Sequence, residues 1–399
     1  MTMPNSAKID SQLAVLVIGI FLCSLAYFIV MPLVPLMISN FENQKNIELW
    51  AGMVMGVSAL VSAAVNPIWG HISAKYGAKS MLLKASFGLS LTYFFTPFAT
   101  SLPQLFLLRC LNGLMAGYIP AALAMISKDA MSTKIGKSMA YVSIAQAAGT
   151  LCGPAIGGFL SAKFGIHASF NMAAVMVLIC GLLSLVYLKN VQFNTDNYNI
   201  SLKKSIKIMV QSTTIRNAIL FTFFIYILGS TLQPIIPLQI KALTLNPTQT
   251  SIYLGGIYST GGAVSLIFGL LWGRATDKWG LKKILPIVFA GGFVSCLLLF
   301  SSTSIVGFTL SFAVYSVFSC ALGIIANINI AKSASEKNLA MAFSINHTGA
   351  QLGNALGPVL GGFIATAFAL SGTFIFTSAL FLIAIVILFH FFLNKNVVE

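Results

Sequence analysis

The chain has few charged side chains. Asp, Glu, Lys and Arg together make up 8% of its 399 residues, whereas soluble domains contain roughly 25%. Hydrophobic residues make up 57%. A surface this poor in charge excludes a water-soluble enzyme, and lipid is the solvent that such a surface fits.

Motifs of several other protein classes are missing. There is no G-x-x-x-x-G-K-S/T sequence, so ATP is not the direct energy source. The six cysteines contain no C-x-x-C pair, and the four histidines are scattered, so we expect no metal, no cofactor and no enzymatic activity. A channel would need a re-entrant filter and a receptor a soluble output domain, and neither is visible. The first ten residues are polar and show no cleavable signal.

Acidic residues are the scarcest charged group, with eight in the chain. None lies deep in a predicted membrane span, although proton-coupled exporters usually carry protons on a carboxylate there. Either another group titrates, or transport is coupled to something else. The same scarcity favours neutral, zwitterionic or anionic cargo over cationic drugs. The acids are Asp10, Glu42, Glu48, Asp129, Asp196, Asp277, Glu336 and Glu399.

Long apolar segments fill the rest of the chain. Each is about 20 residues or more, enough to cross a bilayer, and must be helical because lipid offers the backbone no hydrogen bonds. The fold class is therefore all-α membrane protein with twelve transmembrane helices. The segments are 12–38, 49–72, 79–99, 102–126, 138–161, 168–188, 215–239, 251–273, 283–301, 304–331, 338–364 and 369–393.

Basic residues are distributed unevenly about these spans. Only Lys45, Lys163 and Lys241 lie on one side, Arg109 lies inside a span, and the other basic residues lie in or beside segments on the opposite side. By the positive-inside rule both termini are cytoplasmic. The net charge of +15 therefore reflects membrane topology, and we expect no nucleic-acid partner.

The two halves of the chain repeat. MPLVPL at 31–36 recurs as QPIIPL at 233–238, WGHISAKYGAKS at 69–80 as WGRATDKWGLKK at 272–283, and GTLCGPAIGGFL at 149–160 as GNALGPVLGGFI at 353–364. Such repeats are typical of transporters whose site lies between the halves near mid-membrane. We expect a six-helix bundle at 1–188, a cytoplasmic linker at 189–214 and a second bundle at 215–399.

At these blocks the chain resembles the major facilitator superfamily, particularly twelve-span drug:proton antiporters of the bacterial multidrug-exporter type. The family's loop after helix 2 is present in part, with Ala74 at its acidic position, and the acid appears in the second copy as Asp277. The resemblance implies alternating access and assigns gating to this loop and to the glycine-rich packing block. The implied gating residues are Gly70, Lys75, Gly77, Asp277, Lys278, Gly149, Gly153, Pro154, Gly157, Gly353, Gly357 and Pro358.

Two residues are candidates for charge chemistry. Arg109, in the family's helix 4 motif LRCLNGLMAG, could tune proton release or hold an anionic substrate, or could be a structural tie to neighbouring carbonyls. His347, in the polar stretch NHTGAQLGN, titrates near neutrality and is a candidate proton carrier. The alternative for His347 is a neutral, hydrogen-bonded packing residue.

Uncharged polar and aromatic residues in the spans predict a polar, aromatic cavity. The resemblance places that cavity along helices 1, 4, 7 and 10, with 2, 5, 8 and 11 beside them. The alternative is that each residue only joins helices, a contact worth about 0.6 kcal/mol. The candidate cavity residues are Arg109, Asn112, Tyr27, Tyr118, Gln146, Tyr226, Gln233, Tyr258, Asn327, Asn329 and Gln351.

These observations predict a secondary active transporter of a small amphipathic solute in the bacterial inner membrane. The leading hypothesis is a proton-coupled exporter that works as a monomer, with protons, the solute and the lipid bilayer as its partners. The alternative is a siderophore or other metabolite carrier of the same fold, working in either direction.

Overall fold

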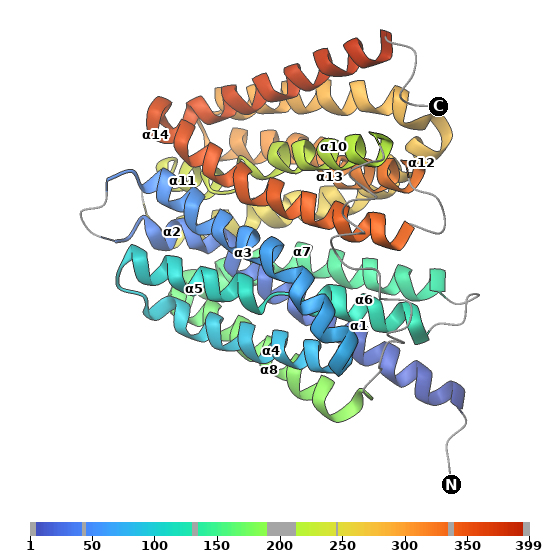
Figure 1. Cartoon of the computed structure of the whole chain (residues 1–399). Coiled ribbons are helices and arrows are strands. Elements are labelled where there is room, and N and C mark those ends of the chain that lie inside the picture. Colours follow the sequence, from blue (N-terminus) through green and yellow to red (C-terminus); the bar gives the residue numbers. More distant parts are fainter. Residues whose placement is uncertain are drawn as a thin grey trace. The chain divides into compact units, whose positions relative to one another are not determined.

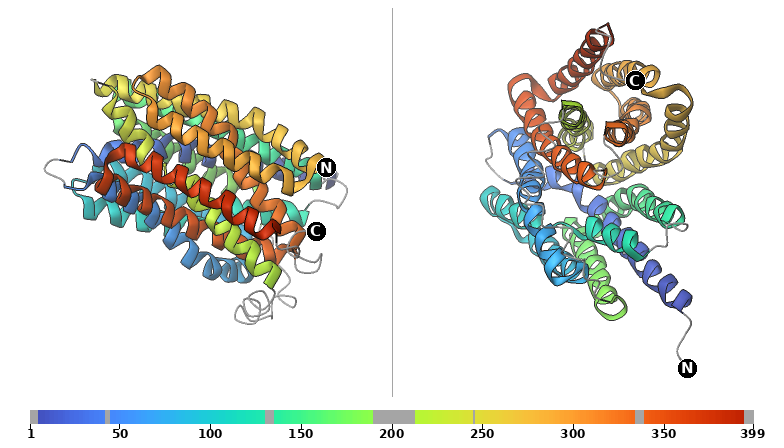
Figure 2. Two further views of the ribbon diagram at one scale, coloured as in Figure 1. Left: turned by 90° about the horizontal axis from the view of Figure 1, so that it is seen from above. Right: turned by 45° about the vertical axis from the view of Figure 1, so that its right-hand side comes forward.

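The computed structural model describes residues 5–41, 45–129, 135–189, 213–244, 246–333 and 339–393. Figures 1 and 2 show helices throughout this part of the chain. The elements are α1 (Asn5–Val30), η1 (Met31–Leu33), α2 (Val34–Ile38), α3 (Ile47–Tyr76), α4 (Ala78–Phe95), η2 (Thr96–Phe98), α5 (Leu102–Met115), α6 (Tyr118–Asp129), α7 (Ile135–Phe164), α8 (Ile166–Tyr187), α10 (Thr213–Ser230), α11 (Ile235–Ala242), α12 (Pro247–Ser301), α13 (Ile305–Ser333) and α14 (Leu339–Leu393).

The helices confirm the predicted all-α membrane fold. Among the described residues, 9 helical segments are long and apolar enough to cross a membrane. Two of them, α12 and α14, each contain two helices joined at a non-helical backbone position. Counting these as pairs and adding α4 gives the twelve spans that the sequence predicts. Most of the expected linker, residues 190–212, lies outside the described residues.

The repeated prolines lie where a span is interrupted. Pro32 lies in η1, the short 3-10 turn between α1 and α2. Pro234 precedes the first residue of α11, after the turn that ends α10. Proline lacks the N–H that an α-helix needs at this position, so each copy of the motif interrupts its helix.

Four residues reverse the chain between consecutive spans, and all have positive φ. Gly77 (φ 90) joins α3 to α4, and Gly280 (φ 76) lies at the junction inside α12. Gly165 (φ 82) joins α7 to α8, and Ala369 (φ 64) lies at the junction inside α14. Each pair occupies equivalent positions of the sequence repeat, so the two halves turn in the same way.

Two tryptophans show the same repeat in their hydrogen bonds. Trp69 Nε1 donates to the carbonyl of Leu114 at 3.0 Å. Trp272 Nε1 donates to the carbonyl of Val317 at 2.7 Å. Both bonds span 45 residues, so each half ties its second helix to its fourth at the same place.

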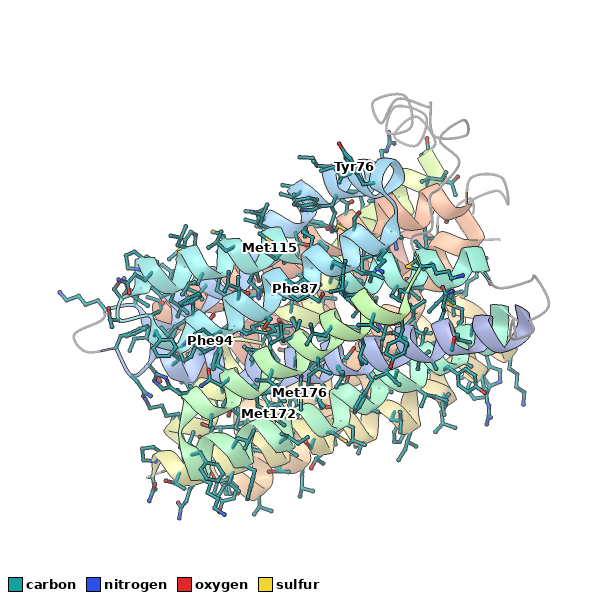
Figure 3. All side chains as sticks on the ribbon, turned by 90° about the horizontal axis from the view of Figure 1, so that it is seen from below. Tyr76, Phe87, Phe94, Met115, Met172 and Met176 are labelled. Carbon is teal, nitrogen blue, oxygen red and sulfur yellow. The ribbon has the colours of Figure 1, made fainter. Side chains whose placement is uncertain are left out.

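The chain forms two compact units. Unit 1 contains residues 1–34, 61–199 and 247–259, and unit 2 contains residues 35–60, 200–246 and 260–399. In unit 1, α4 and α8 pack side by side and carry an apolar outer surface (Figure 3). Phe94 on α4 and Met172 on α8, which Figure 3 labels, are 45% and 40% exposed. Apolar side chains on an outer face are what contact with lipid tails requires.

Candidate functional site

Arg109 is the buried charge at the centre of the candidate site in unit 1. It lies on α5, which begins after Ser101 with proline in its first turn. Only 3% of Arg109 is exposed. Its Nε and Nη2 atoms have no hydrogen-bond partner among the described residues. A guanidinium with free donors in a buried place is costly, so a ligand that accepts hydrogen bonds would be favoured there.

Two tyrosines lie near this guanidinium, and a hydrogen-bonded pair of polar residues joins α4 to α5 one turn away. Tyr27 on α1 and Tyr93 on α4 lie close enough to interact electrostatically with Arg109. One turn along α5, Asn112 Nδ2 donates to Thr92 Oγ1 on α4 at 3.2 Å. We call these five residues, Tyr27, Thr92, Tyr93, Arg109 and Asn112, the Arg109 cluster.

Sequence reasoning selected three members of the Arg109 cluster and missed Thr92 and Tyr93. Both lie in the run LSLTYFF near the end of α4. The adjacent threonine and tyrosine were the available signal, because a polar pair inside a span usually faces protein rather than lipid. Tyr93 is 4% exposed and Thr92 is 6% exposed, as that rule requires.

Tyr118 packs elsewhere in unit 1. Its hydroxyl lies 3.2 Å from Ser184 Oγ on α8, and its side chain is buried. Nearby, the sulfur atoms of Cys23 and Cys180 lie 3.7 Å apart, and both cysteines are free. The structure therefore shows Tyr118 joining α6 to α8.

The other predicted cavity residues are divided between the units. Gln146 on α7 and Tyr258 on α12 belong to unit 1 and are partly buried. In unit 2, Gln351 accepts a hydrogen bond from Asn354 on the same helix at 3.5 Å, and His347 is exposed. Also in unit 2 are Tyr226 on α10, Gln233 between α10 and α11, and Asn327 and Asn329 on α13.

The predicted packing glycines do lie where helices meet closely. In unit 1, a Cβ added to Gly149 or Gly153 would lie 2.6 Å from the Cβ of Ser24 or Phe28 on α1. In unit 2, a Cβ added to Gly353 would lie 2.7 Å from the Cβ of Tyr226 on α10. Small residues permit this approach of one membrane helix to another. In both copies of the block, the glycines therefore allow a neighbouring helix to approach closely.

Consecutive glycines in each block contact two different segments of the chain. Gly157 lies against Ile29 of α1, whereas Gly158 lies against Ser251 and Gly255 of α12. In unit 2, Gly361 lies against Thr231 and Gly362 against Glu48 at the start of α3. Pro154 and Pro358 lie inside α7 and α14 within these blocks. Each block therefore packs against two different segments of the chain.

The predicted gating loops lie at the ends of α3 and of the first helix in α12. Gly70 and Lys75 are in the helical part of α3, and the Lys75 side chain lies outside the described residues. Gly77 starts α4 with a positive φ. Asp277 and Lys278 lie on α12, and Lys278 is exposed there.

A model of the Major Facilitator Superfamily matches residues 16–211 and 218–398. The chain belongs to this superfamily, as the sequence blocks predict. It is 29% identical over 371 residues to an uncharacterized MFS-type transporter, YuxJ, of Bacillus subtilis, covering 90% of this chain and 93% of the relative. It is 30% identical over 376 residues to a multi-drug resistance efflux pump PmrA homolog of Lactococcus lactis, covering 90% of each.

Solved structures agree on the fold. The nucleoside transporter NupG matches with a TM-score of 0.79 at 14% identity, covering 96% of this chain and 99% of that one. The chain is a multi-pass membrane protein and a secondary transporter of small molecules. The relatives give no support to the siderophore-carrier alternative.

Proposed function

We propose that this chain is a proton-coupled exporter of a small amphipathic solute, and that the Arg109 cluster in unit 1 binds the solute. The observation that supports this is the buried guanidinium whose Nε and Nη2 have no partner among the described residues. The name of the Lactococcus lactis relative, a multi-drug resistance efflux pump homolog, favours export of more than one compound.

The cluster combines the features that a promiscuous solute site needs. The two tyrosine rings offer apolar surface with a polar tip, and the guanidinium offers several donors in one plane. Such a site suits a solute that has an aromatic or aliphatic body and a hydrogen-bond acceptor. We propose that the protein works as a monomer in the bacterial inner membrane with both termini in the cytoplasm, and that it has no enzymatic activity.

The role of the cluster is tested by Arg109→Ala and Arg109→Lys. Hydrogen bonds to a charged group are worth about 1.5–3 kcal/mol, so Arg109→Ala should weaken solute binding by about 10- to 150-fold. Arg109→Lys keeps the charge but not the planar fork, so it should recover only part of the affinity. Accumulation of a labelled panel of drugs and organic anions, in cells with and without the gene and with and without a protonophore, first identifies a solute.

Two results would contradict the proposal. One is a panel in which no compound changes its accumulation when the gene is deleted. The other is full transport by a folded Arg109→Ala protein, which would leave Arg109 a structural residue. Size-exclusion behaviour and far-UV circular dichroism of the purified variant show whether it is folded.

A further inference from the structure

The apolar segment Leu102–Ile126 of unit 1, long enough to span a membrane, is interrupted near its middle. α5 ends at Met115 and α6 begins at Tyr118, and the two are separate helices in Figure 1. Between them Ala116 leaves the helical conformation (φ −56, ψ 158) and Gly117 has a φ of 129. The positive φ favours glycine here, whereas a Cβ would meet only the terminal methyl of the flexible Met81 side chain on α4, which can move aside.

A broken membrane helix leaves backbone carbonyls without their usual partners. The last carbonyls of a helix carry its negative dipole end, and in lipid they need donors from elsewhere. The structure supplies donors from two other helices. Leu114 O accepts from Trp69 Nε1 at 3.0 Å and from Lys84 Nζ at 3.1 Å, and Ala116 O accepts from Lys84 Nζ at 3.3 Å.

The ammonium of Lys84 also lies over an aromatic ring. Its Nζ is 3.7 Å from the centroid of the Trp69 ring, well within the range of a cation–π interaction. Two carbonyl oxygens and one indole face thus surround a single positive charge. These are the groups that bind an alkylammonium ion in proteins.

The second half of the chain has no such arrangement among its described residues. The equivalent tryptophan, Trp272, still donates to Val317. However, α13 is continuous through Val317, from Ile305 to Ser333, and the repeat places Ile287 where the first half has Lys84. The first half therefore has both Lys84 and the helix break, whereas the described part of the second half has neither a lysine nor a break at the equivalent place.

We propose that the α5–α6 break forms a cation site within unit 1 that is selective for primary ammonium groups. The ammonium group at the end of the Lys84 side chain occupies this site. Occupancy stabilises the break, which sets the direction of α5 relative to α6. Because Arg109 and Asn112 lie on α5, Lys84 is a positioning residue for the Arg109 cluster.

The site is tested by removing the tethered cation and supplying a free one. In Lys84→Ala the carbonyls and the Trp69 ring remain, and ethylammonium chloride provides the missing group. Trp69 is the reporter in a variant whose other three tryptophans, Trp50, Trp272 and Trp279, are replaced by phenylalanine. This measurement needs no transported solute, so its outcome is independent of the function proposed above.

We expect ethylammonium to change the Trp69 fluorescence of Lys84→Ala with saturation. Tetramethylammonium, which has no N–H group to donate, should bind at least about tenfold more weakly. The protein with Lys84 intact should show no saturable change, because its site is already occupied. A variant that keeps only Trp272 should not respond either.

Lys79→Ala is a matched control from the same helix. Lys79 Nζ also donates to two carbonyls, those of Leu185 and Leu188 at 2.7 and 2.6 Å, but at the end of α8 rather than at a break. Lys79→Ala should give Trp69 no response to ethylammonium. If Lys84→Ala is not recovered folded, ethylammonium present throughout purification should restore its yield and tetramethylammonium should not.

Several results would overturn the proposal. They are the lack of a saturable response in Lys84→Ala, an equal response to both cations, an equal response with Lys84 intact, and a yield that ethylammonium does not restore. The positioning role adds a further requirement. Lys84→Arg, which keeps charge and donors, should retain the apparent KM for a solute found by the panel, whereas Lys84→Ala should raise it unless ethylammonium is added.

Discussion

Ala369 occupies a backbone conformation that three glycines adopt at the other equivalent turns. Its φ and ψ are 64 and 170, against 82 and 165 at Gly165 and 76 and 160 at Gly280. Only glycine enters this region readily, and another residue there is destabilised by about 1–3 kcal/mol. We predict that Ala369→Gly stabilises the protein.

Two opposing effects determine how much Ala369→Gly changes the free energy of unfolding. Relief of backbone strain contributes about 1–3 kcal/mol, and the greater freedom of glycine in the unfolded chain costs about 0.4–1 kcal/mol. The net gain is about 0.5–2 kcal/mol, which raises an apparent Tm by about 1–8 °C for a folding unit of about 150–250 residues. Gly165→Ala should lower it by a similar amount. A Cβ at Gly165 would meet no atom within 4 Å, so the whole effect there is conformational.

Thermal unfolding of the purified protein in one detergent measures these changes. Gly273→Ala is the matched control, because Gly273 lies within α12 and a Cβ there also meets no atom within 4 Å. That substitution should raise stability by up to about 1 kcal/mol, the helix preference of alanine over glycine. The reasoning is refuted if Ala369→Gly lowers the apparent Tm, or if Gly165→Ala and Gly273→Ala shift it in the same direction.

Three further predictions concern packing, the tryptophan ties and proton movement. Gly153→Ala should lower the free energy of unfolding by about 1–3 kcal/mol relative to Gly273→Ala, because the added Cβ would overlap α1. Equal apparent Tm values for the two variants would contradict this. Trp272→Phe removes the hydrogen bond to Val317, so it should lower the free energy of unfolding by about 0.5–1.5 kcal/mol. Thermal unfolding measures this change, and an unchanged apparent Tm would count against that bond. His347→Ala should abolish solute-driven proton movement in reconstituted vesicles while solute binding is retained, and unchanged proton flux would exclude His347 as the carrier.

The repeated blocks predicted the fold well because they act through close contacts. The prolines at 32 and 234 interrupt helices and the glycines at 149 and 353 admit a neighbouring helix, and both effects are properties of the residue itself. The twelve spans followed from hydrophobic length alone. These features required no knowledge of which helices become neighbours.

The helix break and the full Arg109 cluster could not be predicted in the same way. Gly117 lies at the end of the motif LRCLNGLMAG, and a hydrophobicity window of about 20 residues does not register a single positive φ. Lys84 counted as one of the basic residues expected on the cytoplasmic side of the membrane. That interpretation gave no reason to expect its contacts with the carbonyls of Leu114 and Ala116. Tyr93 required knowledge of how α4 faces α5, which a single sequence does not contain.

The one-residue turns also bear on how the protein enters the membrane during synthesis. α3 ends at Tyr76 and α4 begins at Ala78, and α7 ends at Phe164 and α8 begins at Ile166. A connection this short holds the end of one helix beside the start of the next. We therefore predict that each such pair is inserted into the bilayer as one helical hairpin during synthesis.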